Sequence, residues 1–344
     1  MPCIFWPKKT LRKNYGDDMI EGMIEKNWQL CLELLPFGDD YLLHPEDYVR
    51  TFDVTINGKL RHLKTYKADE KGWNLRRLHT AFSKYVSGRY VHARSSYAYV
   101  KKKGILDFVN RHLENDCFLK TDIHAYFDSI KEDDMVMRVR KLRMPGMDRN
   151  VIARLTRACF NEGTLPLGFT SSPVLSDLYL VSLDRKYQKN TDVTYTRYAD
   201  DFLISASGPD ALEKLSLFQT ELREDLKALG LELNKKKTYY RQFLQPGDAI
   251  HVLGVNIVKT EGPRNRITIS DRYVRETSKA LCAWLDKEPA VKTSEELSQI
   301  CGKIGFIKYC SPDSFQKLEK MIRIKSGYSG ELTLNALQES AGIN

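Results

Sequence analysis

Apolar positions in the first part of the chain recur with the spacing of a helix and then with that of a hairpin. In residues 15–50 they return every three or four positions, at Ile20, Met23, Ile24, Trp28, Leu30 and Leu34, which predicts a helix. Residues 51–66 then alternate on both sides of Asn57-Gly58. That pair favours a two-residue turn because both turn positions need positive φ. We therefore predict a helix followed by a β-hairpin.

The rest of the chain mixes helices with short strands. Residues 73–115 predict a helix, a basic loop and a second helix, and residues 117–130 predict a strand that runs into a turn. The later pattern predicts interrupted helix at 132–161, a helix from about Pro173, two strands around an acidic turn at 194–207, a helix at 209–229, one strand at 251–258 and mostly helix from 270. With no internal repeat or low-complexity linker, the chain is expected to be one compact α+β protein with inserted subdomains.

Composition narrows the class of protein. The 344 residues are 42% hydrophobic, enough for two or three packed subdomains, and the net charge of +9 favours a polyanionic partner without proving one. Seven Cys at irregular spacing, without a CxxC pair, argue against a zinc site or a disulfide framework and favour reduced thiols in a cytosol. No apolar run approaches 18 residues and no secretory signal precedes the first helix, so we expect a cytoplasmic protein without a membrane span.

Three acids stand where acids are unexpected. Asp122 ends an apolar strand, and Asp200 and Asp201 lie between two runs of strand-forming residues. Acids are poor strand formers and costly near a core, whereas hard divalent cations bind carboxylate oxygens. Two metals about 3.5–4 Å apart can activate a 3′-hydroxyl and hold a leaving pyrophosphate, provided that carboxylates from different strands converge. The alternative is a surface turn and a helix cap.

The context of these acids resembles the reverse transcriptase family. Tyr198-Ala199-Asp200-Asp201 looks like the metal-binding turn of that family, and KTDIHAYFDSI (120–130) looks like its first palm motif. LPLGFTSSPVLSDLYL (165–180), LELNKKKT (231–238), HVLGVNIV (251–258) and CGKIGFIKYCSPDSFQKL (301–318) are similar to the second palm motif, the Lys-Thr motif, the primer-grip hairpin and the thumb helix. The resemblance covers about residues 70–325, with order and spacing intact.

The resemblance implies a metal site and an acid. Asp122 and Asp200 would be the principal ligands of two Mg²⁺ ions, with Mn²⁺ as an alternative metal. Asp201 would support them, and the backbone carbonyl of Ile123 would complete the first site. Lys237 matches the lysine that lies near the pyrophosphate and acts as a general acid, although Lys235 and Lys236 beside it leave the assignment open by one position.

The same resemblance implies a nucleotide site. Phe127 matches the steric gate that selects dNTPs over NTPs, with core packing as the alternative. Tyr126 and Phe127 are adjacent, so in a strand only one of the two rings can point inward. Leu167 departs from the usual Gln of the LPQG motif, and Gly168 permits close backbone approach. The triphosphate would be bound by cations of the fingers, for which the candidates are Lys71, Arg76 and Arg77. A solvated helix face is the competing interpretation of these three.

Nucleic acid would contact further segments. Arg94, Lys101 and Lys102 lie in a loop where basic and aromatic residues interleave, which suits phosphates and stacked bases. Ser172-Pro173 would start a template-side helix. Leu253-Gly254 would form part of the primer grip and Lys303 part of the thumb; wet lysines and inward-packed tyrosines are the competing interpretation.

The expected architecture is a right-hand polymerase. We predict an N-terminal helical extension at 1–50 and a C-terminal tail at 331–344. Between them we expect fingers at 51–121 and 132–164, a palm with antiparallel sheet and primer grip at 122–131 and 165–258, and a helical thumb at 259–330. Little sequence follows the thumb, so multi-domain viral and intron layouts are not expected.

The implied activity is RNA-directed DNA synthesis, with an RNA template, a DNA product and dNTPs as partners. The template would be a structured noncoding RNA in a bacterial retron or an anti-phage defence system; a diversity-generating enzyme is also considered, since no subgroup motif fits fully. An effector protein or a second copy of the chain is a further candidate partner. The alternatives are an RNA-dependent RNA polymerase, a template-independent or protein-primed DNA polymerase, and a non-catalytic RNA-binding scaffold.

Overall fold

The computed structural model describes residues 17–56, 59–142, 148–288 and 291–340. Within these ranges the chain forms two compact units. The first comprises Met1–Gly104, Lys120–Ile204 and Ser216–Tyr239, and the second comprises Ile105–Leu119, Ser205–Leu215 and Tyr240–Asn344. None of the helices in the described ranges is both long and apolar enough to cross a membrane.

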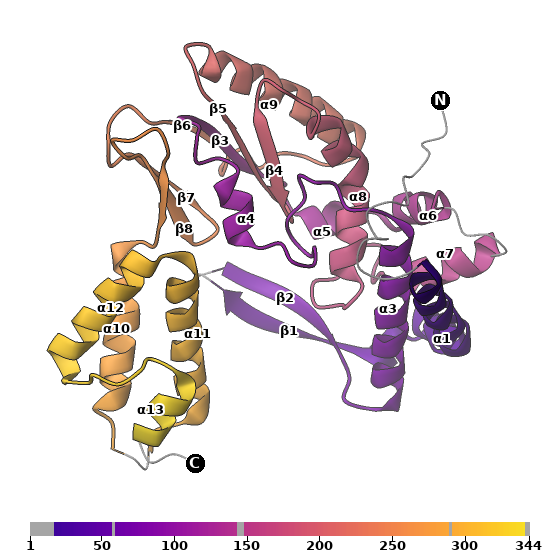
Figure 1. The fold of residues 1–344 in the computed structure, drawn as a ribbon. Helices are drawn as coiled ribbons and strands as arrows, with labels where there is room; N and C mark the ends of the chain where they lie inside the picture. The colour runs from indigo at the N-terminus through magenta and orange to yellow at the C-terminus, as the bar shows by residue number, and fades with distance from the viewer. Residues whose placement is uncertain (1–16, 57–58, 143–147, 289–290, 341–344) are drawn as a thin grey trace. The chain divides into compact units, whose positions relative to one another are not determined.

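Helices form one side of the first unit. Helix α1 (Asp17–Leu43) packs against α3 (Glu70–Arg89) and α7 (Arg149–Arg157), and α7 packs against α6 (Glu132–Arg140) (Figure 1). The buried face of α1 is helical in spacing, and its Trp28 ring lies 5.0 Å from that of Tyr85 in α3. The predicted N-terminal helix is therefore confirmed for its described part, followed by the short α2 (Pro45–Tyr48).

The predicted hairpin is present. Strands β1 (Val49–Ile56) and β2 (Lys59–Tyr66) pair antiparallel, with Val49 opposite Tyr66. The turn predicted at Asn57-Gly58 lies outside the described residues, as does the break predicted near Pro145-Gly146. Most side chains of the two strands are exposed or half-buried, so the hairpin is an extended arm.

A four-stranded sheet carries the acids. Its order is β4 (Thr194–Tyr198), β5 (Asp201–Ala206), β3 (Cys117–Asp122) and β6 (Tyr239–Gln242). β4 and β5 are antiparallel because only Ala199 and Asp200 join them. Along the chain, the short α5 (Tyr126–Ser129) follows β3, α8 (Ser172–Tyr187) precedes β4, and α9 (Ala211–Ala228) lies between β5 and β6. The central strands are almost entirely buried, whereas β6 is exposed.

The second unit joins a small sheet to a helical bundle. β7 (Ala249–Val252), β8 (Val255–Val258) and β9 (Arg266–Thr268) form an antiparallel sheet. Helices α10 (Asp271–Leu285), α11 (Ser294–Cys310) and α12 (Pro312–Ser326) pack on one another, and α13 (Leu334–Ser340) packs on α11 (Figure 1). The short α4 (Ile105–Asn110) also belongs to this unit.

Two expectations about local structure were wrong. Residues 251–258 belong to two strands, not one, because Leu253 (φ 49°) and Gly254 (φ 89°) reverse the chain. Positive φ at both central positions is the mark of a type I′ turn. Tyr126 and Phe127 lie in a helical turn rather than a strand, after Ala125 adopts a left-handed conformation with φ 45°.

Candidate active site

Asp122 is the last residue of β3 and retains only 2% of its exposure. A carboxylate at this depth is costly unless it is paired. Lys237 Nζ pairs with Oδ2 of Asp122. Oδ1 is shielded from solvent and has no hydrogen-bond partner among the residues that the structure describes. One oxygen of a buried carboxylate is therefore left for a further cation or donor.

The acidic turn lies against the end of the same strand. Ala199 and Asp200 connect β4 to β5, and β5 is the direct neighbour of β3 in the sheet. The backbone N–H of Ile123 donates to the carbonyl of Asp200 at 3.1 Å. Asp122 and the pair Asp200-Asp201 thus converge on one place, although a long stretch of sequence separates them.

The three carboxyl groups influence one another electrostatically. Burial raises the pKa of Asp200, and the charge of Asp122 raises it further. Burial and the neighbouring Asp200 raise the pKa of Asp201 to about 6. Arg61 and Lys237 oppose the rise at Asp200, and Lys120 opposes it at Asp201. The site is short of positive charge, so an additional cation would stabilise it.

The segment that carries Lys237 is attached to the end of β3. His124 N–H donates to the carbonyl of Glu232 at 2.8 Å, and Asn234 N–H donates to the carbonyl of Asp122 at 2.8 Å. Burial alone would lower the pKa of Lys237, but the hydrogen bond to Asp122 raises it above its usual value. Of the three consecutive lysines, Lys237 is the one whose ammonium group pairs with Asp122.

The donor set fits a hard divalent cation. Mg²⁺ and Mn²⁺ prefer carboxylate and carbonyl oxygens as ligands. Asp122 Oδ1 has no hydrogen-bond partner among the described residues, and the neighbouring Asp200 has a raised pKa, so both would be stabilised by a cation. Within residues 17–56, 59–142, 148–288 and 291–340, no three His, Cys, Asp or Glu side chains are already grouped closely enough to hold an ion. Binding a metal would require Asp200 and Asp201 to approach Asp122 and Lys237 to yield its place.

Sequence comparison identifies the family. The profile described as reverse transcriptase (RNA-dependent DNA polymerase) matches residues 57–257, which is more than half of the 344 residues. The chain belongs to the reverse transcriptase family. The three acids, the turn and Lys237 all lie inside the matched region, and the resemblance inferred from the sequence motifs is confirmed.

Bacterial retron enzymes are among the relatives of this reverse transcriptase. The Escherichia coli retron Ec73 reverse transcriptase is 25% identical over 242 residues, covering 66% of this chain and 73% of that protein. The E. coli retron Ec86 reverse transcriptase is 29% identical over 207 residues, covering 57% and 60%. This likeness agrees with the retron-like character expected from the motifs.

A solved telomerase has the same type of fold. The apo telomerase from Candida tropicalis aligns with a TM-score of 0.50 at 12% identity, covering 82% of this chain and 58% of that one. The reverse transcriptase thus spans less than two thirds of the telomerase chain it matches. Together with the mixed helices and antiparallel strands, the alignment confirms the α+β polymerase fold.

Gly168 is held against the hairpin arm. Lys64 N–H in β2 donates to the carbonyl of Leu167 at 3.0 Å. Gly168 has φ 109°, and a Cβ there would lie 2.2 Å from the carbonyl oxygen of Lys64. Only glycine fits this conformation and this approach. Leu167, where the family's motif has Gln, is half-buried.

The predicted template-side helix begins as expected. α8 starts at Ser172, with Pro173 in its first turn. The hydroxyl of Ser172 donates to the carbonyl of Pro166 at 2.6 Å, so the helix start and the Gly168 loop are held together.

Phe127 is half-buried beside this loop, and its carbonyl accepts from Leu165 N–H at 3.3 Å. Its neighbour Tyr126 is 3% exposed and donates to the carbonyl of Ser176 at 2.5 Å. The expectation that only one of the two rings packs inward therefore holds, although the reason is the helical turn and not strand alternation. Tyr126 is therefore the core residue of the pair, and Phe127 is the more exposed of the two.

The three side chains considered as ligands of the triphosphate already have interaction partners, which differ from one to the next. Lys71 is paired with Asp40 at 3.2 Å and with Asp47 at 2.7 Å. The Arg76 guanidinium stacks on Trp73 at 5.7 Å, and Arg77 donates to Asn74 at 3.1 Å. All three lie on α3. Besides Lys237, the cation that lowers the pKa of Asp200 is Arg61, an exposed residue of β2 that sequence reasoning missed.

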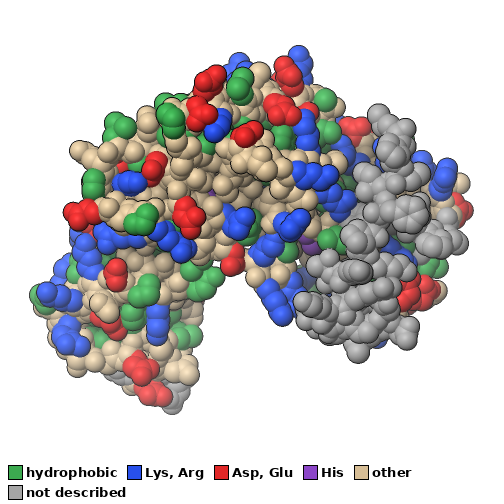
Figure 2. All heavy atoms as spheres, turned by 45° about the horizontal axis from the view of Figure 1, so that its top comes forward, with side chains coloured by type: hydrophobic (Ala, Val, Ile, Leu, Met, Phe, Trp, Pro, Cys, Tyr) green, Lys and Arg blue, Asp and Glu red, His purple; other side chains and the backbone are tan. Residues whose placement is uncertain are grey.

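The basic loop at 94–104 is partly structural. Lys103 Nζ donates to the carbonyls of Arg94 and Ser96, each at 2.8 Å, and lies 4.5 Å from the centre of the Tyr97 ring. Lys101 and Lys102 are exposed, and Tyr99 is 46% exposed at φ 60°. On the face seen in Figure 2, Lys and Arg side chains are interspersed with Asp and Glu.

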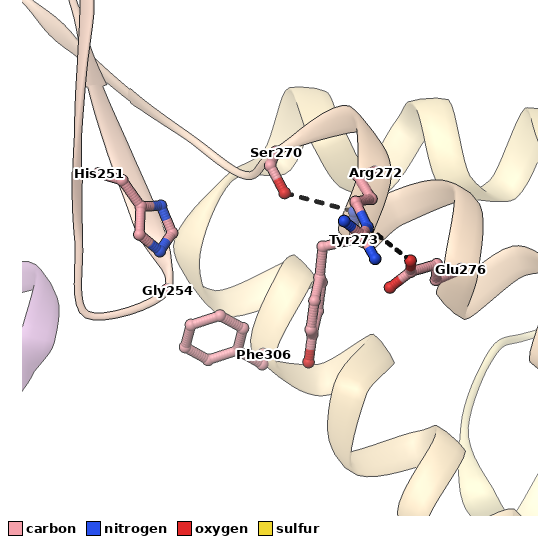
Figure 3. A pocket seen from close by; sticks show the side chains of 7 residues that line it. All are labelled: His251, Gly254, Ser270, Arg272, Tyr273, Glu276 and Phe306. Carbon is pink, nitrogen blue, oxygen red and sulfur yellow. Dashed lines mark hydrogen bonds and ion pairs between the residues drawn. The ribbon is translucent and has the colours of Figure 1, made fainter. Parts of the chain in front are cut away.

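A pocket of about 480 Å³ lies beside the Leu253-Gly254 turn in the second unit (Figure 3). His251, Tyr273, Glu276 and Phe306 are among its lining residues. A Cβ on Gly254 would lie 3.3 Å from the ring of Phe306, so the turn is seated on α11. The same helix carries the exposed Lys303.

Sequence reasoning also missed Arg197, two residues before the acidic turn. Its side chain is 1% exposed and pairs with Asp177 and Asp184, which are equally buried. Burial would lower the pKa of Arg197, but Asp184 and Asp177 raise it well above its usual value. The only sequence signal was two acids spaced by seven residues in a buried helix.

Proposed function

We propose that this reverse transcriptase is an RNA-directed DNA polymerase that adds dNTPs to a 3′-hydroxyl by a two-metal mechanism. One observation carries the proposal. In a chain that belongs to this family, the β3–β5 pairing brings buried Asp122 beside Asp200 through the Ile123 hydrogen bond.

The metal ligands would be Asp122, the backbone carbonyl of Ile123 and Asp200, with Asp201 in support. When bound, Mg²⁺ or Mn²⁺ supplies Lewis-acid activation of the 3′-hydroxyl and neutralises charge on the departing pyrophosphate. The Ile123–Asp200 hydrogen bond holds the backbone of the acidic turn against the end of β3, so the adjustment needed for metal binding would be one of side chains.

Lys237 would be the general acid. Its ammonium group is held at the edge of the acid cluster by Asp122, and its raised pKa keeps it protonated at neutral pH. A protonated amine released from Asp122 can donate a proton to the pyrophosphate oxygen that leaves. Arg61, whose charge reaches Asp200, is the cation that we propose for the incoming triphosphate; Lys71, Arg76 and Arg77 would act only after exchanging their present partners.

Phe127 would select dNTPs. This half-buried residue follows the end of β3 that carries Asp122, and its backbone carbonyl accepts from Leu165 N–H, close to the Gly168 loop. Primer extension with dNTPs and with NTPs tests this choice. The native enzyme should prefer dNTPs, and Phe127→Ala should admit NTPs; equal use of NTPs by the native enzyme would favour an RNA polymerase.

The nucleic acid would follow basic and turn residues in both units. Arg94, Lys101 and Lys102 would bind phosphates, and Ser172-Pro173 would start the helix near the template. In the second unit, Leu253-Gly254 and Lys303 would meet the primer and the duplex. We retain the division into fingers, palm, thumb, N-terminal extension and C-terminal tail, at the boundaries given above, as part of this proposal.

We further propose that the template is a structured noncoding RNA in a retron or anti-phage defence system. The support is that the relatives described above are named as retron reverse transcriptases. Sequencing the nucleic acid that copurifies with the protein tests it. One recurrent RNA joined to or accompanied by its complementary DNA is the expected result; DNA without a complementary RNA, or synthesis that survives RNase treatment, would favour template-independent or protein-primed synthesis.

A further inference from the structure

Arg197 reaches the catalytic turn itself. Its Nη1 donates to the carbonyl of Ala199 at 2.9 Å, while Nε and Nη2 are engaged with carboxylates. Ala199 is a non-glycine residue at φ 56°, a conformation that persists only where the surroundings impose it. The next carbonyl, that of Asp200, accepts from Ile123 N–H. Asp200 is therefore fixed by a hydrogen bond on each side.

The carboxylates that hold Arg197 belong to one helix face. Asp177 and Asp184 are seven residues apart in α8, which is about two helical turns. Arg197 Nη2 lies 2.7 Å from Asp177 Oδ1 and 2.5 Å from Asp184 Oδ2. Both acids are fully buried, and they accept from Nε and Nη2, so the guanidinium is held against the helix at two points.

A third element meets the same arginine. Arg197 N–H donates to the carbonyl of Ser95, and Tyr97 N–H donates to the carbonyl of Arg197. The hydroxyl of Ser96 donates to Asp177 Oδ1 at 2.7 Å. The basic loop, α8 and the turn are therefore joined through one side chain and its backbone.

We propose that Arg197 is a positioning residue that sets the conformation of the Ala199-Asp200 turn by linking it to α8 and to the loop at Ser96. It does not touch substrate; it acts through the carbonyl of Ala199. The proposal rests on the proposed function only for its effect on rate, because the geometry of the turn can be measured without catalysis.

A purely structural role of Arg197 predicts a different result from a positioning role. If the ion cluster only stabilised the core, any variant that weakens it would lower stability, and activity would follow the folded fraction. If Arg197 positions the turn, loss of the Ala199 hydrogen bond lowers kcat in protein that is still folded. Tyr195 supplies a matched control, since its hydroxyl donates to Asp184 Oδ1 at 2.7 Å in the same cluster.

The experiment compares Arg197→Lys with Tyr195→Phe in the full chain, below the melting temperature of both. Arg197→Lys keeps the charge but not the reach of the planar guanidinium. We expect kcat to fall at least tenfold with KM for dNTP within twofold. Hydrogen exchange in peptides spanning 120–126 and 197–203 should become at least tenfold faster. Tyr195→Phe should change neither quantity by more than twofold.

Two results would overturn the proposal: folded Arg197→Lys with native kcat and native exchange in these peptides, or equal losses in Tyr195→Phe. If Arg197→Lys does not fold, the charge-balanced variant Arg197→Met/Asp184→Asn, which removes one charge of each sign, decides, with fast exchange at the turn expected and native exchange contradicting the proposal. Asp200→Asn separates the two hypotheses. Full activity in that variant would defeat the proposed function, while the exchange result at the turn would still judge Arg197.

Discussion

Two groups of buried charge meet at the β4–β5 turn: the Arg197 cluster and the acid cluster of Asp122, Asp200 and Asp201. They differ in whether their charges are paired. In the Arg197 cluster every nitrogen of the guanidinium has an acceptor, and both oxygens of Asp177 and Asp184 have donors. In the acid cluster, Asp122 Oδ1 has no hydrogen-bond partner among the described residues. Burial and the charge of Asp122 raise the pKa of Asp200, and burial and the charge of Asp200 raise that of Asp201.

The pKa of Asp177 makes the contrast plain. Burial alone would raise it, yet the hydrogen bond from His92 and the charge of Arg197 hold it well below its usual range. The same burial at Asp201 is opposed only weakly, by Lys120 and Lys237. The charges of the Arg197 cluster are paired within the fold, as expected of charges with a structural role. The acid cluster lacks such pairing, as expected of a site that binds a ligand.

The acid cluster should break most completely at Asp200. We expect Asp200→Asn to lower dNTP incorporation roughly a thousandfold or more, because charge stabilisation of the transition state is lost, while RNA affinity stays within twofold. Primer extension and filter binding measure the two quantities. Asp192→Asn, at an exposed acid on the loop before β4, is the matched control; native activity in Asp200→Asn would remove the site assignment.

Lys237 should come next. Lys237→Met removes the proposed general acid and should lower kcat by roughly 10- to 100-fold. Because it also leaves the buried Asp122 carboxylate without its cation, kcat is compared below the melting temperature of the variant. The exposed neighbour Lys235 provides the control in Lys235→Met. A larger loss in Lys235→Met than in Lys237→Met would move the role along the run.

Gly168 tests the contact between its loop and β2. Gly168→Ala places a Cβ 2.2 Å from the Lys64 carbonyl at φ 109°, whereas Gly163→Ala, at φ 73°, meets nothing within 4 Å. Both should lose about 1 kcal/mol of unfolding free energy through φ, and Gly168→Ala about 2 kcal/mol more through the clash. Urea unfolding measures the difference; equal losses would show that the Lys64 contact has no cost.

The smallest effect concerns His79 in the supporting framework. Burial lowers the pKa of His79 to about 4. The unfolded chain takes up the proton near pH 6.5 and the folded protein only near 4, so stability falls as pH falls through that window. From pH 7 to pH 5 we expect a loss of about 2 kcal/mol from this residue.

Urea unfolding of the native protein and of His79→Gln at both pH values gives the slope of the unfolding free energy against pH. The loss appears as a smaller slope in His79→Gln than in the native protein. His44→Gln, at an exposed histidine, should retain the native slope. Parallel behaviour of all three proteins would contradict the assignment of the pH dependence to the buried imidazole.

The sequence predicted the elements and the convergence of the acids because both depend on local pattern and motif order. It predicted one strand at 251–258 where there are two, because an apolar residue such as Leu253 is not typical of the first position of a tight turn, as Asn is in an Asn-Gly pair. It named Lys71 as one candidate for the triphosphate but not the ion pairs of that lysine, because Asp40 and Asp47 lie more than twenty residues away. Arg197 was overlooked for the same reason, since its partners on α8 and at Ser96 become neighbours only in the folded chain.

The most direct test is anomalous diffraction from crystals of the full chain grown with Mn²⁺, for the native protein and for Asp200→Asn. The account predicts anomalous density between the carboxylates of Asp122 and Asp200 in the native protein, with Lys237 displaced from Asp122, and its loss in the variant. Native crystals that bind Mn²⁺ elsewhere, with Lys237 still paired to Asp122, would contradict it.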